Sequence, residues 1–337
     1  MLLSFTLDEL KKTPPAPLFP NAEGTCVVIG NFDGVHLGHQ ALFRHAQGFG
    51  LPVVAVTFDP HPREVLTNSA PPRLLDTEDR LALLTEAGAE HTLLLTFTRE
   101  LAALSPESFV KNILVERLAM KHLVIGYDFK LGKGRSGDAG KLREMGGSLG
   151  FKVDQLQCLT DAEGNAISST NIRECLLKGD VAMAAKLLGR VHTVRGVVIH
   201  GQHIGHKLGF PTANLDPNLP GMEAIGLALP GVYATRALLP APGQPLPAPR
   251  LHTLPAGVLP DGAEVFPAVT NIGCKPTFGC TTLSVETHIP GLDRDLYGQP
   301  MALSFIHRLR GEQKFASLDD LKKQIKLDLE QAVKLSS

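Results

Sequence analysis

Residues 26–45 read CVVIGNFDGVHLGHQALFRH, and this stretch decides the fold of the first half of the chain. The run Cys26–Ile29 is short and continuously apolar, as in a strand that is buried on both faces of a parallel sheet. The segment Gly30–Gly34 then turns the chain, and Gly34 permits a backbone conformation that other residues resist. A helical pattern follows, with one side formed by Leu37, Ala41, Leu42 and His45. Strand, glycine turn and helix together predict the first unit of an α/β sheet.

Two histidines, His36 and His39, are three residues apart, so we expect them in the first helical turn on one face. Backbone N–H groups and the positive end of the helix dipole suit a phosphate there, and Gly38 allows close approach. Two imidazoles can also stabilise charge that develops on a phosphoryl group. The pair alone fits a surface helix equally well, whereas two histidines are too few ligands for zinc. Because the two histidines come directly after the predicted strand and glycine turn, they favour phosphate binding and nucleotidyl transfer.

Composition narrows the class of protein. A chain of 337 residues is long enough for two domains, and a net charge of −1 gives no general attraction to nucleic acid or a membrane surface. Five scattered cysteines without a C-x-x-C pair indicate reduced thiols. The acidic opening is unlike a signal peptide, and no apolar run reaches membrane-spanning length. We therefore expect a cytoplasmic protein with neither a nucleic-acid nor a membrane partner.

The rest of the first half alternates between strand and helix patterns. Strands are predicted at 52–58, 92–97, 122–126 and 152–156, and helices at 81–87, 106–121 and 141–149. This alternation predicts a mostly parallel sheet that is covered on both sides. His61 follows the strand at 52–58 and would lie at the carboxyl edge, where open α/β sheets bind ligands.

A serine- and threonine-rich segment precedes a further predicted helix. Either Ser169 or Thr170 is a natural N-cap for it. Arg173 would then lie in the first turn, where a cation opposes the helix dipole and so indicates an anion partner such as a triphosphate. A plain capped helix with a solvated arginine remains the alternative.

Composition changes near residues 188–190, where short alternating strands with Gly/Pro turns take over. Strands at 194–200, 231–237, 268–272, 283–289 and 301–306 predict a small antiparallel barrel. The proline-dense stretch 238–266 predicts a stiff surface loop. Ser317 and Asp320 would cap a last helix. Its expected apolar stripe is Leu318, Leu321, Ile325, Leu329 and either Ala332 or Val333.

Glycines recur every fourth residue at Gly201, Gly205 and Gly209, just before a threonine and an asparagine. Such glycines either let a flap approach phosphates or simply form turns. The hydroxyl of Thr212 and the carboxamide of Asn214 offer oxygen ligands for magnesium.

Alternation in the strand at 283–289 places Ser284, Glu286 and His288 on one face. If this face lines a pocket, Glu286 can accept a proton from a substrate hydroxyl during phosphoryl transfer. If it faces water, Glu286 is an ordinary exposed acid.

The strings in this chain resemble the bacterial bifunctional riboflavin kinase/FAD synthetases over nearly its whole length, and H-x-G-H at 36–39 resembles the nucleotidyltransferase signature. The first half matches at GNFDGVHLGH (30–39), TFDPHP (57–62), LSPESFV (104–110), GYDF (126–129) and ISSTxIR (167–173). The second half matches at GFPTANL (209–215), GVYA (231–234), NIGxxPTF (271–278), VETHI (285–289), DLYG (295–298) and RLRGEQKF (308–315). Each string is modest, but their joint order is specific.

The resemblance implies two domains and two reactions. Residues 188–337 would form a small β-barrel with a terminal helix that phosphorylates riboflavin to FMN with ATP and Mg²⁺. Residues 1–187 would form a Rossmann-like nucleotidyltransferase domain with a parallel sheet, which transfers AMP from ATP to FMN and yields FAD and pyrophosphate. Riboflavin, FMN and ATP are thus the expected partners.

The resemblance also assigns site residues. The implied catalytic groups are Glu286 as base and, for the ATP phosphates, His36, His39 and Arg173. The implied ligand-binding residues of the first reaction are Gly30, Phe32, Asp33, Phe58, His61, Asp128, Ser169 and Thr170. Those of the kinase reaction are Gly205, Gly209, Thr212 and Asn214, of which Thr212 and Asn214 would hold the metal.

Three departures from the family pattern qualify these assignments: Asn171 beside the triphosphate residues, Leu131 where a phenylalanine is frequent, and the long 238–266 connection. Asn171 motivates an alternative in which the kinase works but adenylyl transfer is weak or lost. A flavin- or nucleotide-binding regulator without turnover is a third hypothesis. The intact Glu286 argues against it, because binding alone needs no acid beside an acceptor hydroxyl.

Overall fold

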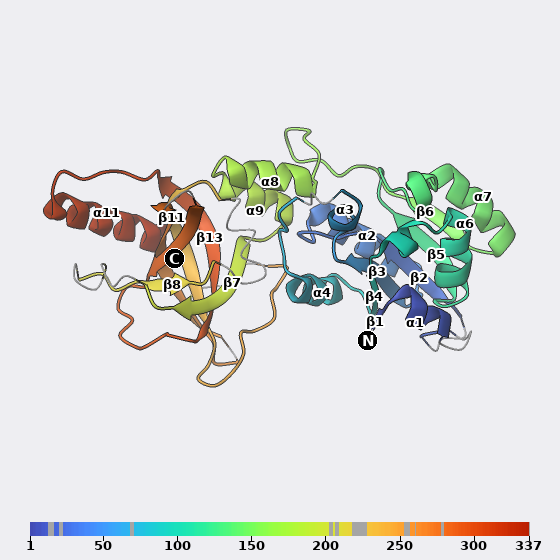
Figure 1. Ribbon diagram of the computed structural model, residues 1–337, viewed down its shortest axis with the longest axis horizontal. Helices are drawn as coiled ribbons and strands as arrows, with labels where there is room; N and C mark the ends of the chain where they lie inside the picture. The colour runs from blue at the N-terminus through green and yellow to red at the C-terminus, as the bar shows by residue number, and fades with distance from the viewer. Residues whose placement is uncertain are drawn as a thin grey trace. The chain divides into compact units, whose positions relative to one another are not determined.

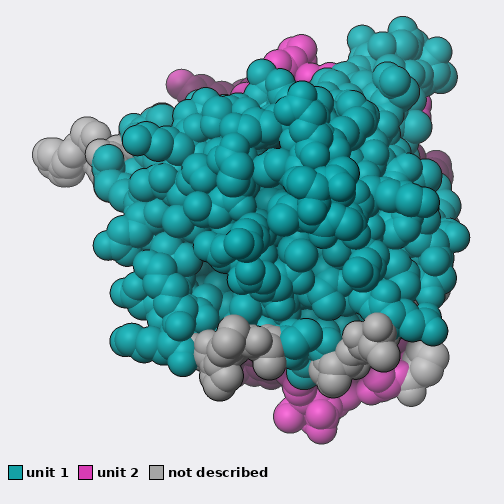
Figure 2. Space-filling view, turned by 90° about the vertical axis from the view of Figure 1, so that its right-hand side faces the viewer, with its two compact units in different colours: residues 1–71, 77–167 teal, residues 72–76, 168–337 magenta. Residues whose placement is uncertain are grey.

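The computed structural model describes residues 1–12, 17–19, 23–67, 71–201, 205, 209–217, 228–252, 257–259, 261–277 and 280–336. The chain divides into two compact units, residues 1–71 with 77–167 and residues 72–76 with 168–337, which are coloured separately in Figure 2. The domain boundary expected between residues 187 and 188 stays a prediction.

The first unit contains a sheet with the strand order β1-β4-β3-β2-β5-β6, in which every neighbouring pair is parallel (Figure 1). The strands are β1 Leu2–Phe5, β2 Thr25–Ile29, β3 Val53–Asp59, β4 His91–Thr96, β5 Met120–Ile125 and β6 Lys152–Gln155. All five residues of β2 are buried. Because successive side chains alternate between faces, this strand must be covered on both sides, which confirms the predicted parallel α/β sheet.

Helices connect these strands. They are α1 Leu7–Lys12, α2 Leu37–Gln47, α3 Pro62–Thr67, α4 Thr77–Glu86, α5 Arg99–Ala102, α6 Pro106–Phe109, the π-helix η1 Val110–Val115, the 3₁₀ helix η2 Lys133–Arg135 and α7 Ala139–Leu149. The helix predicted at 106–121 is wrong at its end, because Ala119 adopts a φ of +52° and Met120 already pairs with Thr25 in the sheet. The predicted apolar side of α2 also needs correction, since His45 is exposed and its place is taken by Phe43 and Ala46.

The second unit begins with α8 Ser169–Leu177 and α9 Val181–Leu188 and continues as a barrel. Its strands are β7 His192–Ile199, β8 Ala213–Leu215, β9 Gly231–Leu239, β10 Gly257–Val258, β11 Glu264–Thr277, β12 Cys280–His288 and β13 Pro300–Arg310. In the described part of the chain, six of them close a ring in the order β11-β12-β8-β7-β13-β9, because β11 also pairs with β9. Each adjacent pair is antiparallel, which confirms the predicted barrel.

Short elements escaped sequence prediction. Strands β8 and β10 have three and two residues, which is too few for an alternating pattern. The described parts of the proline-rich stretch 238–266 are not purely surface loop, because Leu246 and Leu259 pack against the buried side chains of Leu238 and Ala263. Residues 253–256 and 260 lie outside the described part.

The terminal helix α11, Leu318–Ser336, packs against β9, β11 and β13 (Figure 1). The backbone N–H of Asp320 donates to the hydroxyl of Ser317 at 3.1 Å, which confirms the predicted cap. The apolar stripe is shorter than predicted, since Ala332 is buried whereas Leu318 and Val333 are exposed. Within the described ranges, none of the helices combines the length and apolar character that crossing a membrane requires.

Candidate active sites

The first candidate site lies at the carboxyl edge of the parallel sheet. From β2 the chain proceeds through β3 to β4 on one side, whereas β5 and β6 lie on the other side of β2. This reversal of direction lies between β2 and β5, and open α/β sheets bind ligands outside the carboxyl ends of the strands at such a point. Residues 30–36, which we call the histidine loop, follow β2, whereas His61 follows β3 and Asp128 follows β5. The sheet therefore brings these sequence-predicted residues to one edge.

His36 is the N-cap of α2, so the expectation that both histidines lie within the first helical turn is wrong for His36. Its backbone is extended, and its Nδ1 accepts the N–H of His39 at 3.4 Å. The two rings still stack, with centroids 3.6 Å apart and an interplanar angle of 21°. Because Nδ1 acts as an acceptor, a neutral His36 ring carries its proton on Nε2, where it can serve as a donor.

Burial holds His39 in its neutral form. It lowers the pKa of His39 well below the ordinary value, and the neighbouring His36 lowers this pKa further. Its Nδ1 is buried and has no hydrogen-bond partner among the described residues. A Cβ on Gly38 would lie 3.1 Å from the His36 ring, so a larger residue would press on the pair. The site therefore holds a stacked pair of imidazoles, in which His39 keeps one buried ring nitrogen without a partner among the described residues.

The loop from Gly30 to the histidines is buried from Phe32 to His36 and is conformationally unusual. Phe32 and Val35 have φ angles of +52° and +39°, which are rare for residues other than glycine. Phe32, which is 1% exposed, packs edge-on against His39 with ring centroids 5.3 Å apart, and this contact helps to fix the His39 ring. Asp33 is also buried, and the N–H of Gly30 donates to the carbonyl of Val56.

Asn31 is a candidate residue that the sequence analysis missed. Its side-chain Nδ2 lies 3.3 Å from Nε2 of His61, and Nδ1 of His61 accepts the N–H of Arg63 at 3.1 Å. Phe58 lies just before His61, half-buried against the ring of Phe97. Asn31 is the second residue after the buried strand β2, and that position was the available signal.

Asp128 is exposed just beyond β5, and its backbone carbonyl accepts a hydrogen bond from Arg135. Leu131, by contrast, is 8% exposed and belongs to the hydrophobic core. The expected departure from the family pattern at Leu131 therefore falls on a core side chain.

The remaining residues assigned to the first reaction lie on α8, which belongs to the second unit. The cap is Ser168, whose hydroxyl accepts the N–H of Asn171 at 3.2 Å, so the prediction of Ser169 or Thr170 as N-cap is wrong. Ser168 has the extended backbone that a cap needs, whereas Ser169 is already helical. Thr170 is exposed, and the Nε of Arg173 donates to the carbonyl of Pro72 at 2.8 Å.

The second candidate site lies on one face of the barrel. Glu286 of β12 is directly opposite Asn214 of β8 and, on its other side, opposite Asn271 of β11. Directly opposed residues project from the same face of a sheet with Cβ atoms about 5 Å apart. Val285 and Thr287 are buried on the other face, whereas Glu286 is half-buried. The strand register thus brings together a carboxylate and an amide that sequence analysis had chosen separately.

Glycines approach this face closely. A Cβ on Gly201 would clash with the side-chain amide of Asn214, and one on Gly205 would clash with the carbonyl of Phe210. The latter Cβ would also lie 3.2 Å from the hydroxyl oxygen of Thr212. Gly209 follows with a φ of +86°. Residues 202–204 and 206–208 lie outside the described part. Gly201 and Gly205 need the small size of glycine, whereas Gly209 needs its backbone freedom.

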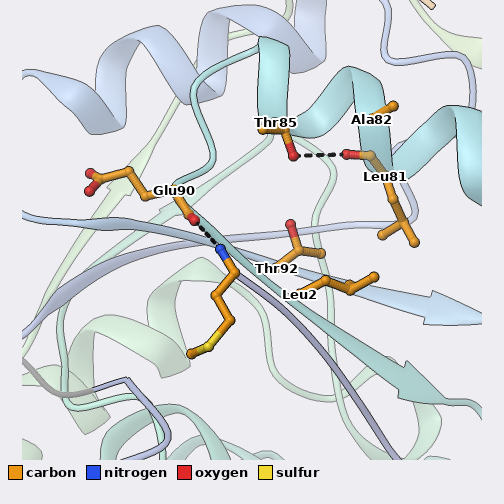
Figure 3. A pocket seen from close by; sticks show the side chains of 7 residues that line it. Leu2, Leu81, Ala82, Thr85, Glu90 and Thr92 are labelled. Atoms are coloured by element: carbon orange, nitrogen blue, oxygen red, sulfur yellow. Dashed lines mark hydrogen bonds between the residues drawn. The ribbon is translucent and has the colours of Figure 1, made fainter. Parts of the chain in front are cut away.

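A separate cavity of about 240 Å³ lies near the amino ends of β1 and β4 in the first unit (Figure 3). It is lined by Met1, Leu2, Leu81, Ala82, Thr85, Glu90 and Thr92. The carboxylate of Glu90 points away from it in Figure 3 and accepts the N–H of Val53. This cavity lies at the opposite ends of the strands from His61 and presents no catalytic group.

Comparisons with known proteins agree with this two-part organisation. The FAD synthetase family matches residues 19–171, and the riboflavin kinase family matches residues 188–336. Bifunctional riboflavin kinase/FMN adenylyltransferase of Escherichia coli K12 is 37% identical over 311 residues, 91% of each chain. The protein of the same description from Haemophilus influenzae is 35% identical over 92% of this chain and 94% of its own.

A solved structure shares the complete architecture. The crystal structure described as a macrolide-efflux protein from Streptococcus pneumoniae superposes with a TM-score of 0.77 at 28% identity, covering 98% of both chains. The two family matches and the similarity to these relatives over more than 90% of the chain show that this chain belongs to the bifunctional riboflavin kinase/FMN adenylyltransferases.

Proposed function

We propose that this chain makes FAD from riboflavin in two ATP-dependent reactions, phosphorylation to FMN and adenylylation of FMN. Family membership establishes the two activities and ATP as the co-substrate. The observation that carries the proposal at residue level is the register of the barrel, which sets Glu286 opposite Asn214. A carboxylate beside a polar ligand-binding group is what phosphoryl transfer to a hydroxyl requires, whereas a binding module would not need the acid.

In the kinase reaction, the oxygen of the ribityl 5′-hydroxyl bonds to the γ-phosphorus of ATP, and Glu286 accepts the proton of that hydroxyl. The bond from the γ-phosphorus to the bridging oxygen breaks, and ADP leaves. Gly205 and Gly209 would bring the backbone close to the phosphates, as the tight approach of Gly205 to Thr212 supports.

Thr212 and Asn214 would hold Mg²⁺, which neutralises phosphate charge when it is bound. Two neutral oxygen donors suit this hard cation, which usually keeps several water and phosphate ligands. The described residues include no cluster of three or more His, Cys, Asp or Glu side chains able to hold a metal, so a cage made only of such ligands is not found there.

In the adenylyl transfer, a phosphate oxygen of FMN attacks the α-phosphorus of ATP and pyrophosphate leaves. His36 and the neutral His39 would donate hydrogen bonds to the phosphoryl oxygens as negative charge develops on them. Ser169, Thr170 and Arg173, which belong to the second unit, stay a sequence-based prediction for contacts to the ATP phosphates. The loop residues Gly30, Phe32 and Asp33 would shape the site, and Phe58, His61 and Asp128 would border it.

The test is to incubate the purified full chain with riboflavin, ATP and Mg²⁺ and to follow FMN and FAD by chromatography. We expect FMN first and FAD after it. FMN alone would show that adenylyl transfer is lost, as the Asn171 hypothesis holds, and absence of both products would favour a binding protein. The cytoplasmic location and the absence of nucleic-acid and membrane partners stay predictions.

A further inference from the structure

Arg80, in the first turns of α4, is a buried cation that the two reactions leave without a role. Only 5% of its surface is exposed. A guanidinium is tolerated in such a place when its N–H groups are hydrogen-bonded. Arg80 donates from Nη1 to the carbonyl of Asn31 at 3.0 Å and from Nη2 to the carbonyl of Phe58 at 2.9 Å.

These two carbonyls lie at the carboxyl ends of neighbouring strands. Asn31 follows β2 and Phe58 is near the end of β3, at the edge that carries His61. Carbonyls at strand ends run out of ladder partners, and the planar fork of an arginine can satisfy two of them at once. Nη2 of Arg80 also lies 4.0 Å from the carboxylate of Asp59, to which Thr77 donates at 3.0 Å. The beginning of α4 therefore ties the two strand ends together.

What this tie holds in place is the histidine loop. Phe32 and Val35 occupy sparsely populated backbone conformations, which persist only where the surroundings fix them. The carbonyl of Asn31 accepts from both Arg80 and the hydroxyl of Thr57, so the entry to the loop is fixed from two directions. The loop ends at His36, and the Asn31 side chain lies beside His61. A shift at Asn31 would therefore displace groups on both sides of the site.

We propose that Arg80 is a positioning residue for FMN adenylylation, which keeps the ends of β2 and β3 in the geometry that aligns His36 and His61. It acts through Asn31 and Phe58 and touches no reacting group. The proposal rests on the proposed function, because it takes the carboxyl edge of this sheet as the adenylyl-transfer site.

Arg80→Met, which keeps an apolar stem but no donor, tests this proposal in the full chain with FMN, ATP and Mg²⁺. We expect kcat for FAD formation to fall about 10- to 100-fold, the size of effect that a misplacement of about 1 Å produces. We expect kinase activity measured on the same preparation to stay unchanged. Arg80→Lys, which can reach one carbonyl, should lose less. Arg99→Met, at an exposed arginine of the same unit, is the matched control and should leave both activities intact.

A double-mutant cycle with Thr57→Val, which removes the other donor to the Asn31 carbonyl, separates positioning from general destabilisation. If Arg80 acts by holding this carbonyl, the loss of kcat caused by Arg80→Met should be several-fold larger in the Thr57→Val background. Equal losses in both backgrounds, or a folded Arg80→Met variant with FAD formation within about twofold of the parent, would overturn the proposal. If Arg80→Met does not fold, Arg80→Lys decides by the same criteria. A His36→Ala variant with full FAD formation would instead refute the proposed site itself.

Discussion

The candidate adenylyl-transfer groups of the first unit lie mostly on loops beyond strand ends, whereas two candidate kinase groups of the second unit, Glu286 and Asn214, project from paired barrel strands. In the barrel, ladder hydrogen bonds fix Glu286 against Asn214, so strand register alone sets their spacing. At the sheet edge, no ladder reaches the histidine loop, and contacts from other elements hold it. One such contact is the hydrogen bond from Arg80 to Asn31.

This difference indicates which substitutions should lower the activity of each site. Groups on regular elements are positioned more precisely than groups on loops, which depend on supporting contacts. Substitutions remote from the chemistry should therefore damage FAD formation more easily than FMN formation. Substitution of the reacting groups should damage each reaction separately.

The largest expected effect is that of Glu286→Gln. Removal of the base should lower the rate of FMN formation by about 100- to 10,000-fold. FAD formation from supplied FMN should persist, because the adenylyl-transfer residues are untouched. Both rates are measured by chromatography on one preparation. Loss of both reactions in a folded variant would contradict separate sites.

His36→Ala should produce a smaller loss, confined to the other reaction. Loss of one donor to a developing anion typically costs about 100-fold in rate, and the variant also removes the cap of α2. Kinase activity on riboflavin is the internal control and should stay at the parent level. Unchanged FAD synthesis would remove His36 from its proposed role.

The smallest expected effect concerns pH and the half-buried His39. Its pKa is lowered in the folded protein, so the unfolded chain binds the proton more readily below the ordinary value of 6.5. Stability contributed by the neutral ring is therefore complete above pH 6.5 and is lost as the pH falls toward the folded pKa. Thermal unfolding followed from pH 7.5 to 5 should show a steeper decline for the parent than for His39→Gln. Parallel declines would contradict burial of a neutral ring.

Local patterns sufficed for much of this account. The alternation at 283–289 placed Glu286 on the face opposite Val285 and Thr287, and the strand–turn–helix pattern at 26–45 placed the histidines at a helix start. Such predictions succeed because strand and helix periods are properties of neighbouring residues.

What failed depended on contacts between residues far apart in the sequence. Arg80 is 49 residues from Asn31, and nothing in its helix pattern reveals that its guanidinium turns inward. Asp328, 4% exposed on α11, is buried because Arg310 binds its carboxylate at 2.8 Å, a partner that helical periodicity cannot supply. The cap at Ser168 lies one residue from the prediction, within the usual uncertainty of a helix boundary. The helix at 106–121 was predicted too long because Met120 pairs with Thr25 in the sheet.

The most direct measurement of the central claim, that two independent sites share this chain, mixes the two single-site variants. Glu286→Gln and His36→Ala are each expected to make little or no FAD from riboflavin, ATP and Mg²⁺ alone. Mixed together, they should restore FAD formation, because FMN made by the His36→Ala protein reaches the intact adenylyl-transfer site of the other. If the mixture makes no more FAD than the separate variants, although Glu286→Gln still adenylylates supplied FMN, the account of two independently working sites is contradicted.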